Sequence, residues 1–124
     1  MTERPAGPPK RWPGWVYGTG EEPDYRFSFA NERTFLAWIR TALALLAAGV
    51  ALDSVELAIP ERAQHALAAF FVGVGFVAAL GSWVRWSQAE RAMRSHAPLP
   101  SFGLGALLTC SVVGAAAALL VLVV

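Results

Sequence analysis

Residues 35–52 read FLAWIRTALALLAAGVAL, and this stretch carries a single charged side chain, Arg40. Two further runs, residues 66–84 and 102–124, contain no charged residue. A helix of ~18 to 20 apolar residues crosses the ~30 Å hydrocarbon core of a bilayer. The sequence therefore predicts an all-α protein with three transmembrane helices, over residues 35–54, 66–84 and 102–124, in contact with the lipid bilayer.

The residues before the first predicted span divide into two parts. Residues 1–23 hold five prolines and four glycines, a composition typical of a flexible tail. The aromatic residues of this tail, Trp12, Trp15 and Tyr17, either touch the lipid headgroup zone or have no structural role. Residues 24–34 have helical composition and lead into the span, so we expect one domain over residues 24–124. No cleavable signal peptide is expected, because the first apolar run begins too late in the chain.

The loops predict an orientation. Residues 53–65 carry a net charge of −2 with the histidine neutral, and residues 85–100 a net charge of +2. Arginine and lysine accumulate on the cytoplasmic side of membrane proteins. We therefore expect the N-terminus in the cytoplasm and the C-terminus outside.

Several function classes have no support in the sequence. The net charge is +1 without a basic cluster, so no nucleic-acid partner is expected. Cys110 is the only cysteine and lies inside a predicted span, away from histidines and acids. No Ser/His/Asp or Cys/His arrangement and no inward pair of carboxylates appears. We expect neither an enzyme, nor a metal site, nor a cofactor.

Arginines recur along one face of the first predicted span. Arg26, Arg33 and Arg40 are seven residues apart, so on a helix they stack on one side about 10.5 Å apart. Small side chains continue this side beyond Arg40: Ala44, Ala47, Ala51 and Ser54. Bulky side chains lie roughly opposite: Trp38, Leu45 and Leu52. Small residues mark the places where transmembrane helices approach closely. This pattern predicts that the arginine face looks into a helix bundle and not into lipid.

A second interpretation of Arg40 stays open. It lies about 7.5 Å inside the apolar stretch, where a charge costs ~2.5 to 3.5 kcal/mol on insertion scales. The other two predicted spans contain no acid that could offset this cost. Either protein shelters the arginine, with water, backbone carbonyl groups, lipid phosphate or a bound anion beside it, or the side chain snorkels to the interface. Further small residues in the later spans, Gly73, Gly114 and Ala118, are predicted helix-packing positions together with the three alanines.

Residues 29–46, FANERTFLAWIRTALALL, resemble the signature of the YidH-like family, whose domain has no assigned function. The resemblance extends over about residues 24–124 and implies a three-span protein of the bacterial plasma membrane. The family is in turn similar to the smallest subunit of the vacuolar transporter chaperone complex, which makes and translocates polyphosphate through a pore lined by basic residues. That likeness implies that Arg33, together with Arg26 and Arg40, lies on a polyanion path. The chain differs in having no polymerase or phosphate-sensing domain and no basic residue in its third span.

Two hypotheses follow for the function. In the first, several copies form a homo-oligomer whose axis is lined by arginines, and these bind or conduct an anion such as phosphate or polyphosphate. In the second, the protein is a non-conducting accessory or scaffold subunit for a membrane partner, and its arginines hold lipid headgroups.

Overall fold

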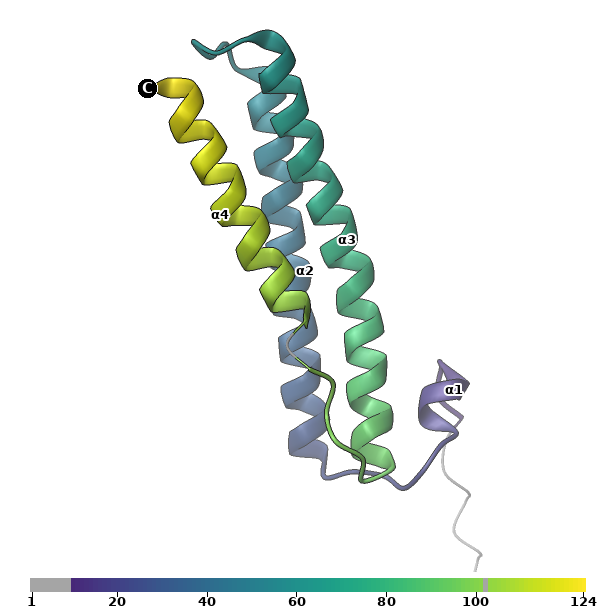
Figure 1. Ribbon diagram of the computed structural model, residues 1–124. Coiled ribbons are helices and arrows are strands. Elements are labelled where there is room, and N and C mark those ends of the chain that lie inside the picture. Colours follow the sequence, from purple (N-terminus) through teal and green to yellow (C-terminus); the bar gives the residue numbers. More distant parts are fainter. Residues whose placement is uncertain (1–9, 102) are drawn as a thin grey trace, which may run out of the picture.

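The computed structural model describes residues 10–101 and 103–124, which form four helices and no strand (Figure 1). They are α1 (Gly14–Tyr17), α2 (Tyr25–Ser54), α3 (Glu61–Arg94) and α4 (Gly103–Val123). The last three are long and apolar enough to cross a membrane. The all-α class and the presence of three helices of membrane-spanning length and composition are therefore confirmed for the described residues. Part of the predicted tail, residues 1–9, and Phe102 at the start of the third predicted span lie outside them.

An antiparallel pair of helices, α2 and α3, forms the body of the protein (Figure 1). Its centre is a small buried cluster of Ala42, Leu45 and Ala78. Two glycines let the backbones approach there. A Cβ atom added to Gly49 would lie 2.7 Å from the Val72 side chain and 2.9 Å from the Ala68 carbonyl oxygen, and one on Gly75 would lie 3.1 Å from the Ala42 carbonyl oxygen. Close approach of small residues is how transmembrane helices associate when lipid removes the hydrophobic driving force.

A tight connection joins the two helices at one end of the pair. Between Ser54 and Glu61 only six residues separate the helices. The Gln64 amide donates to the Leu52 and Val55 carbonyl oxygens, which lie at the end of α2. The His65 Nδ1 atom lies 2.6 Å from an Asp53 carboxylate oxygen. Side chains of α3 thus satisfy backbone groups that the end of a helix leaves unpaired.

Two helices extend beyond the predicted spans. The predicted helix over residues 24–34 and the first span form one continuous helix, α2. The second span, predicted over residues 66–84, lengthens at both ends into α3. Residues 85–94 belong to the segment expected to connect the second and third spans, and in the structure they continue the helix to Arg94, before Pro98. The run contains no proline or glycine, and leaving the apolar zone does not by itself end a helix.

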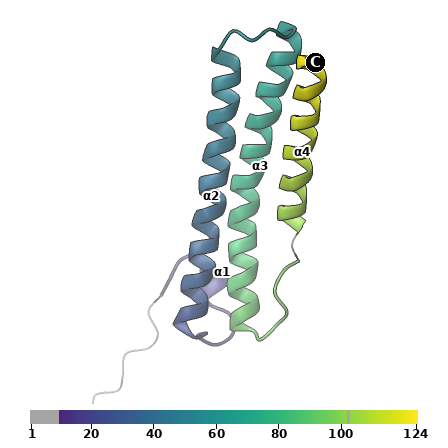
Figure 2. The same cartoon turned by 90° about the vertical axis from the view of Figure 1, so that its left-hand side faces the viewer.

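The last helix, α4, packs mainly against α3, which lies between α2 and α4 in the view of Figure 2. The Leu104 side chain lies against Gly81, and Leu108 packs on the Ala42–Leu45–Ala78 cluster. Toward its end α4 is open, with Leu120 65% and Val121 78% exposed. An apolar surface of this kind is stable only against lipid or another protein.

Residues 10–23 differ from the predicted flexible tail. They include α1, and this short helix packs against the lower part of α3 in Figure 1. The Val16 side chain is fully buried. Aromatic rings hold the contact, with centroids 5.6 Å apart for Trp12 and Trp83 and 6.2 Å apart for Tyr17 and Trp86. Burial of Val16 and these contacts between aromatic rings offset the low helix propensity of a proline- and glycine-rich segment.

Candidate functional site

The arginine face of α2 lies on the side opposite to α3. Arg26, Arg33 and Arg40 are all exposed. At 100° per residue, the four buried residues of this helix fall within about 40° of the point opposite Arg40. These residues are Asn31, Ala42, Leu45 and Gly49. One chain therefore presents its arginines outward, away from its own helices.

The bulky side of α2 is the side that packs against α3. Leu45 is buried, and Trp38 and Leu52 are half-buried. They fit there because the facing positions on α3 are small, with Gly75 and Ala78 both buried. The expectation that the arginine face looks into a helix bundle is thus not met within one chain. Only lipid or a second protein could cover that face.

The predicted helix-packing residues share this outward position. All six are exposed within the chain: Ala44, Ala47, Ala51, Gly73, Gly114 and Ala118. A Cβ atom added to Gly73 or Gly114 would meet nothing within 4 Å. Contacts between helices of one chain use other small residues, notably Gly49, Gly75 and Gly81. A packing role for the six predicted residues therefore requires a neighbouring molecule.

The three arginines differ in their surroundings. The Arg26 Nε atom lies 3.7 Å from an Asp24 carboxylate oxygen, and its guanidinium lies 5.9 Å from the centre of the Tyr25 ring. Within residues 10–101 and 103–124, no acid lies within 4.0 Å of the Arg33 or Arg40 guanidinium nitrogens. Arg33 and Arg40 thus keep their full capacity to bind an anion, whereas Arg26 is partly engaged.

A buried polar cluster joins α2 and α3 at the α1 end of the pair. The Asn31 amide nitrogen donates to the Trp86 carbonyl oxygen at 3.0 Å and to a Glu90 carboxylate oxygen at 3.3 Å. The Ser28 hydroxyl donates to the other Glu90 oxygen at 3.3 Å. Glu90 is only 2% exposed and Asn31 8%. Ser28 and Asn31 are three residues apart and lie on one face of α2. Trp86 and Glu90 are four apart and lie on the facing side of α3, so helical spacing in both helices builds the cluster.

Exchanging Asn31 for leucine tests the energy of this cluster. The variant keeps the branched shape of the side chain but removes two hydrogen bonds, one of them to a buried carboxylate, and we expect a loss of ~1 to 3 kcal/mol in the free energy of unfolding in mixed micelles. The double variant Asn31→Leu with Glu90→Leu should recover part of the loss, because removing both partners leaves no unsatisfied group. Strictly additive losses in this double-mutant cycle would contradict the cluster.

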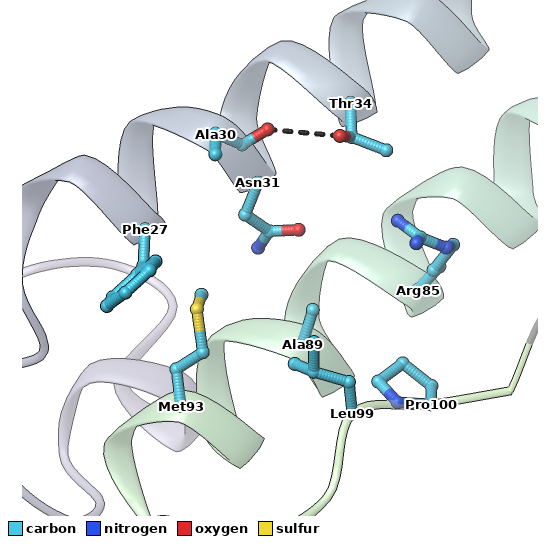
Figure 3. Close-up of a pocket in the computed structure, with 9 residues that line it drawn as sticks. All are labelled: Phe27, Ala30, Asn31, Thr34, Arg85, Ala89, Met93, Leu99 and Pro100. Carbon is cyan, nitrogen blue, oxygen red and sulfur yellow. Dashed lines mark hydrogen bonds between the residues drawn. The ribbon is translucent and has the colours of Figure 1, made fainter.

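A hollow of about 210 Å³ lies beside Asn31, between α2, α3 and the segment that leads to α4 (Figure 3). Its wall is mostly apolar, with Phe27, Met93 and Leu99 among the lining residues. Figure 3 shows the Arg85 guanidinium directed into the space in front of the Asn31 amide. An apolar wall with one guanidinium suits a molecule that has an apolar body and an anionic group.

The docked N-terminal segment is fixed by Arg94 at the end of α3. This side chain is 7% exposed and donates to the Thr19 and Tyr17 carbonyl oxygens, each at 2.7 Å, and to Glu22 at 3.2 Å. The Glu21 amide donates back to the Arg94 carbonyl oxygen at 2.8 Å. Gly20 makes this approach possible, because its φ is +62° and a Cβ atom would lie 2.0 Å from that oxygen.

Glu22 collects two guanidinium groups on this segment. Arg11 and Arg94 both donate to its carboxylate. These hydrogen bonds, with Arg11 the larger contributor, lower the pKa of Glu22 below its ordinary value of 4.5. The ion pairs therefore persist at neutral pH and weaken in acid.

Sequence reasoning missed Asn31, Glu90 and Arg94. The expectation of a loop after residue 84 separated Glu90 and Arg94 from the helix that orients them. One signal was present in the tail, where three aromatic residues occur among prolines and glycines. In the structure all three meet α3, with Trp15 5.7 Å from the Arg91 guanidinium. No group of three or more metal-ligating side chains occurs within the described ranges.

The family model and the similar proteins indicate the same family for this chain. The pattern of the domain of unknown function DUF202 matches residues 26–92. An uncharacterized protein of Mycobacterium tuberculosis is 54% identical over 84 residues, which cover 66% of this chain and 68% of that protein. The inner membrane protein YidH of Escherichia coli is 51% identical over 83 residues, 65% of this chain and 71% of that protein. No solved structure matches.

Proposed function

Because the chain belongs to the DUF202 family and is a small membrane protein similar to YidH, we propose that it forms a homo-oligomer in the bacterial plasma membrane and binds an inorganic anion on the arginine face of α2. The anions in question are phosphate and polyphosphate. We further propose that the α1 end of the pair lies in the cytoplasm and Val124 outside. An alkaline phosphatase fused after Val124 is then expected to be active.

The observation that carries the proposal is the outward position of Arg33 and Arg40, which meet no acidic partner among residues 10–101 and 103–124. A charge at the depth of Arg40 costs ~2.5 to 3.5 kcal/mol if lipid chains surround it. A second copy that covers the alanine strip would remove this lipid contact, and an anion between the copies would neutralise the guanidinium groups. Rings of like charge from several copies are a common basis of anion selectivity.

The test uses the full chain in nanodiscs, with oligomer mass from native mass spectrometry and inorganic polyphosphate as the probe. A mass of several copies is expected. Arg33→Ala with Arg40→Ala should weaken polyphosphate binding at least about tenfold, since each lost charge-assisted hydrogen bond contributes ~1.5 to 3 kcal/mol. It should also flatten the salt dependence. Arg62→Ala, an exposed arginine at the other end of the pair, is the matched control and should change neither.

A monomeric mass, or an unchanged affinity in the double variant, would refute the proposal. The second candidate, an accessory subunit whose arginines hold lipid headgroups, would then take its place. Two observations favour this second candidate. The helix α4 exposes most of its apolar surface, and the 210 Å³ hollow beside Asn31 (the Arg85 hollow) combines apolar walls with the Arg85 guanidinium. If the protein is such an accessory subunit, we expect a monomer that retains phospholipid, and Arg85→Ala should reduce the amount of retained lipid.

A further inference from the structure

A second and larger hollow, of about 440 Å³, lies at the same end of the helix pair. It uses different faces of α2 and α3 from the Arg85 hollow, and the docked N-terminal segment closes one side of it. From that segment come Arg11, Tyr17 and Glu22. The hollow therefore exists only because residues 10–23 fold back onto α3.

Aromatic rings form much of its wall. Six aromatic residues line it: Tyr17, Tyr25, Phe29, Phe35, Trp83 and Trp86. Four of them are in mutual contact. The Trp83 and Trp86 ring centres are 5.2 Å apart, Phe35 lies 6.3 and 6.4 Å from them, and Tyr17 lies 6.2 Å from Trp86. Aromatics of an interfacial belt spread around the protein toward lipid, whereas these converge on one space.

Charge in the hollow is negative. Three carboxylates line it, from Glu22, Glu32 and Glu90, and one guanidinium, from Arg11; because Arg94 also pairs with Glu22, the net charge of these groups is −1. Glu90 is 2% exposed, and its hydrogen-bond donors are the neutral Ser28 hydroxyl and Asn31 amide, each at 3.3 Å. In the part of the chain that the structure describes, no cation forms an ion pair with Glu90. A buried carboxylate without a counter-charge is costly.

One cationic side chain, Arg11, already contacts both an aromatic ring and a carboxylate of this hollow. The Arg11 guanidinium lies 4.3 Å from the centre of the Tyr17 ring and donates to Glu22. It thus combines a cation–π contact with a carboxylate, which is the combination that recognises organic ammonium groups. Arg11 is an exposed residue of the N-terminal segment and does not pair with Glu90.

We propose that this hollow binds an organic ammonium cation. The rings of Trp83, Trp86 and Tyr17 contact its methyl or methylene groups, and Glu90 supplies the counter-charge. An alkali metal ion would not suit the site, because aromatic faces are poor ligands for a strongly hydrated ion. The ammonium group belongs either to a free amine or to the headgroup of an aminophospholipid. The proposal is independent of anion binding on the opposite face of α2.

The experiment titrates the full chain with tetramethylammonium chloride, in nanodiscs of phosphatidylglycerol, which carries no ammonium group. Tryptophan fluorescence and calorimetry report binding, and sodium chloride at equal ionic strength is the reference. A saturable response specific to tetramethylammonium is expected. Glu90→Gln should weaken binding at least about tenfold through the lost ion pair, whereas Glu61→Gln, an exposed acid at the other end, should not.

A second variant keeps the test decisive if Glu90→Gln does not fold. Arg11→Ala removes the internal cation, so its affinity for tetramethylammonium should rise several-fold. Nanodiscs that contain phosphatidylethanolamine then identify the source, because competition by the lipid assigns the site to a headgroup and unchanged affinity assigns it to a free cation. No saturable binding in phosphatidylglycerol, or weaker binding in Arg11→Ala, would overturn the proposal.

Discussion

Replacing Arg94 with alanine is expected to release residues 10–23 from α3. The side chain is buried and makes two short hydrogen bonds to the Tyr17 and Thr19 carbonyl oxygens. Hydrogen bonds that involve a charged group contribute ~1.5 to 3 kcal/mol each, so the loss of two should reduce the docking equilibrium at least about a hundredfold. The pair with Glu22 adds less, because that carboxylate is 61% exposed. Hydrogen–deuterium exchange of peptides from residues 10–23 measures the release.

Two comparisons isolate the effect of Arg94. Arg91→Ala loses only a cation–π contact with Trp15, worth ~0.5 to 1 kcal/mol at an exposed site, and should change exchange little. Lowering the pH provides the second comparison. The pKa of Glu22 is depressed on docking, so its stabilisation is present above about pH 4.5 and is lost as the pH falls through the lower docked-state value. Equal exchange in wild type and Arg94→Ala at neutral pH would disprove the role of Arg94.

Exchanging Gly49 for alanine should weaken the α2–α3 pair by ~1 to 3 kcal/mol, the usual cost of an overpacked contact. The added methyl group would lie 2.7 Å from the Val72 side chain and 2.9 Å from the Ala68 backbone oxygen. A side chain can move away, but the backbone of a packed helix cannot do so without separating the helices. The free energy of unfolding in mixed micelles is the measurement.

Gly73→Ala is the matched control for this experiment, and its sign should be opposite. Beyond its own helical turns, the methyl group meets no atom of the described residues within 4 Å. Alanine in place of glycine favours a helix by ~1 kcal/mol, so the stability should stay constant or rise. A loss for Gly73→Ala as large as that for Gly49→Ala would mean that the α2–α3 contact is not where the structure has it.

The three long helices could be predicted from the sequence because a single quantity, the length of apolar sequence, determines them. Their ends could not. Residues 85–94 leave the apolar zone and stay helical, because a chain without proline or glycine continues its backbone hydrogen bonds in water. The hydropathy pattern reports the membrane boundary, whereas the backbone sets the helix boundary.

The sequence predicts which residues share the arginine face of α2, but not which side of α2 packs against α3. Helical periodicity groups Arg33 and Arg40 with the alanines and sets Trp38 and Leu45 opposite, and the structure keeps this grouping. Which side meets α3 depends on the shape of α3, where small residues receive the bulky side of α2. A pattern within one helix holds no information about its neighbour. Whether a second copy covers the arginines stays a prediction.

No local sequence pattern predicts the polar cluster at the α1 end of the helix pair. Asn31 and Glu90 are 59 residues apart, and each alone looks like an ordinary polar residue near a membrane boundary. Their meeting requires both the antiparallel register and the extension of α3. Arg94 and Thr19 are 75 residues apart and depend on the same extension.

The short connection between α2 and α3 has a consequence for biogenesis. Both members of the closest helix contact are consecutive in the chain, so a ribosome has synthesised the whole hairpin once Arg94 is added. The main contacts of this hairpin form between α2 and α3 and need little from α4, so we expect the pair to close before the last helix docks. The last helix then joins from the side by settling on α3. We therefore expect assembly in two steps, in which the order follows from how many contacts each helix makes.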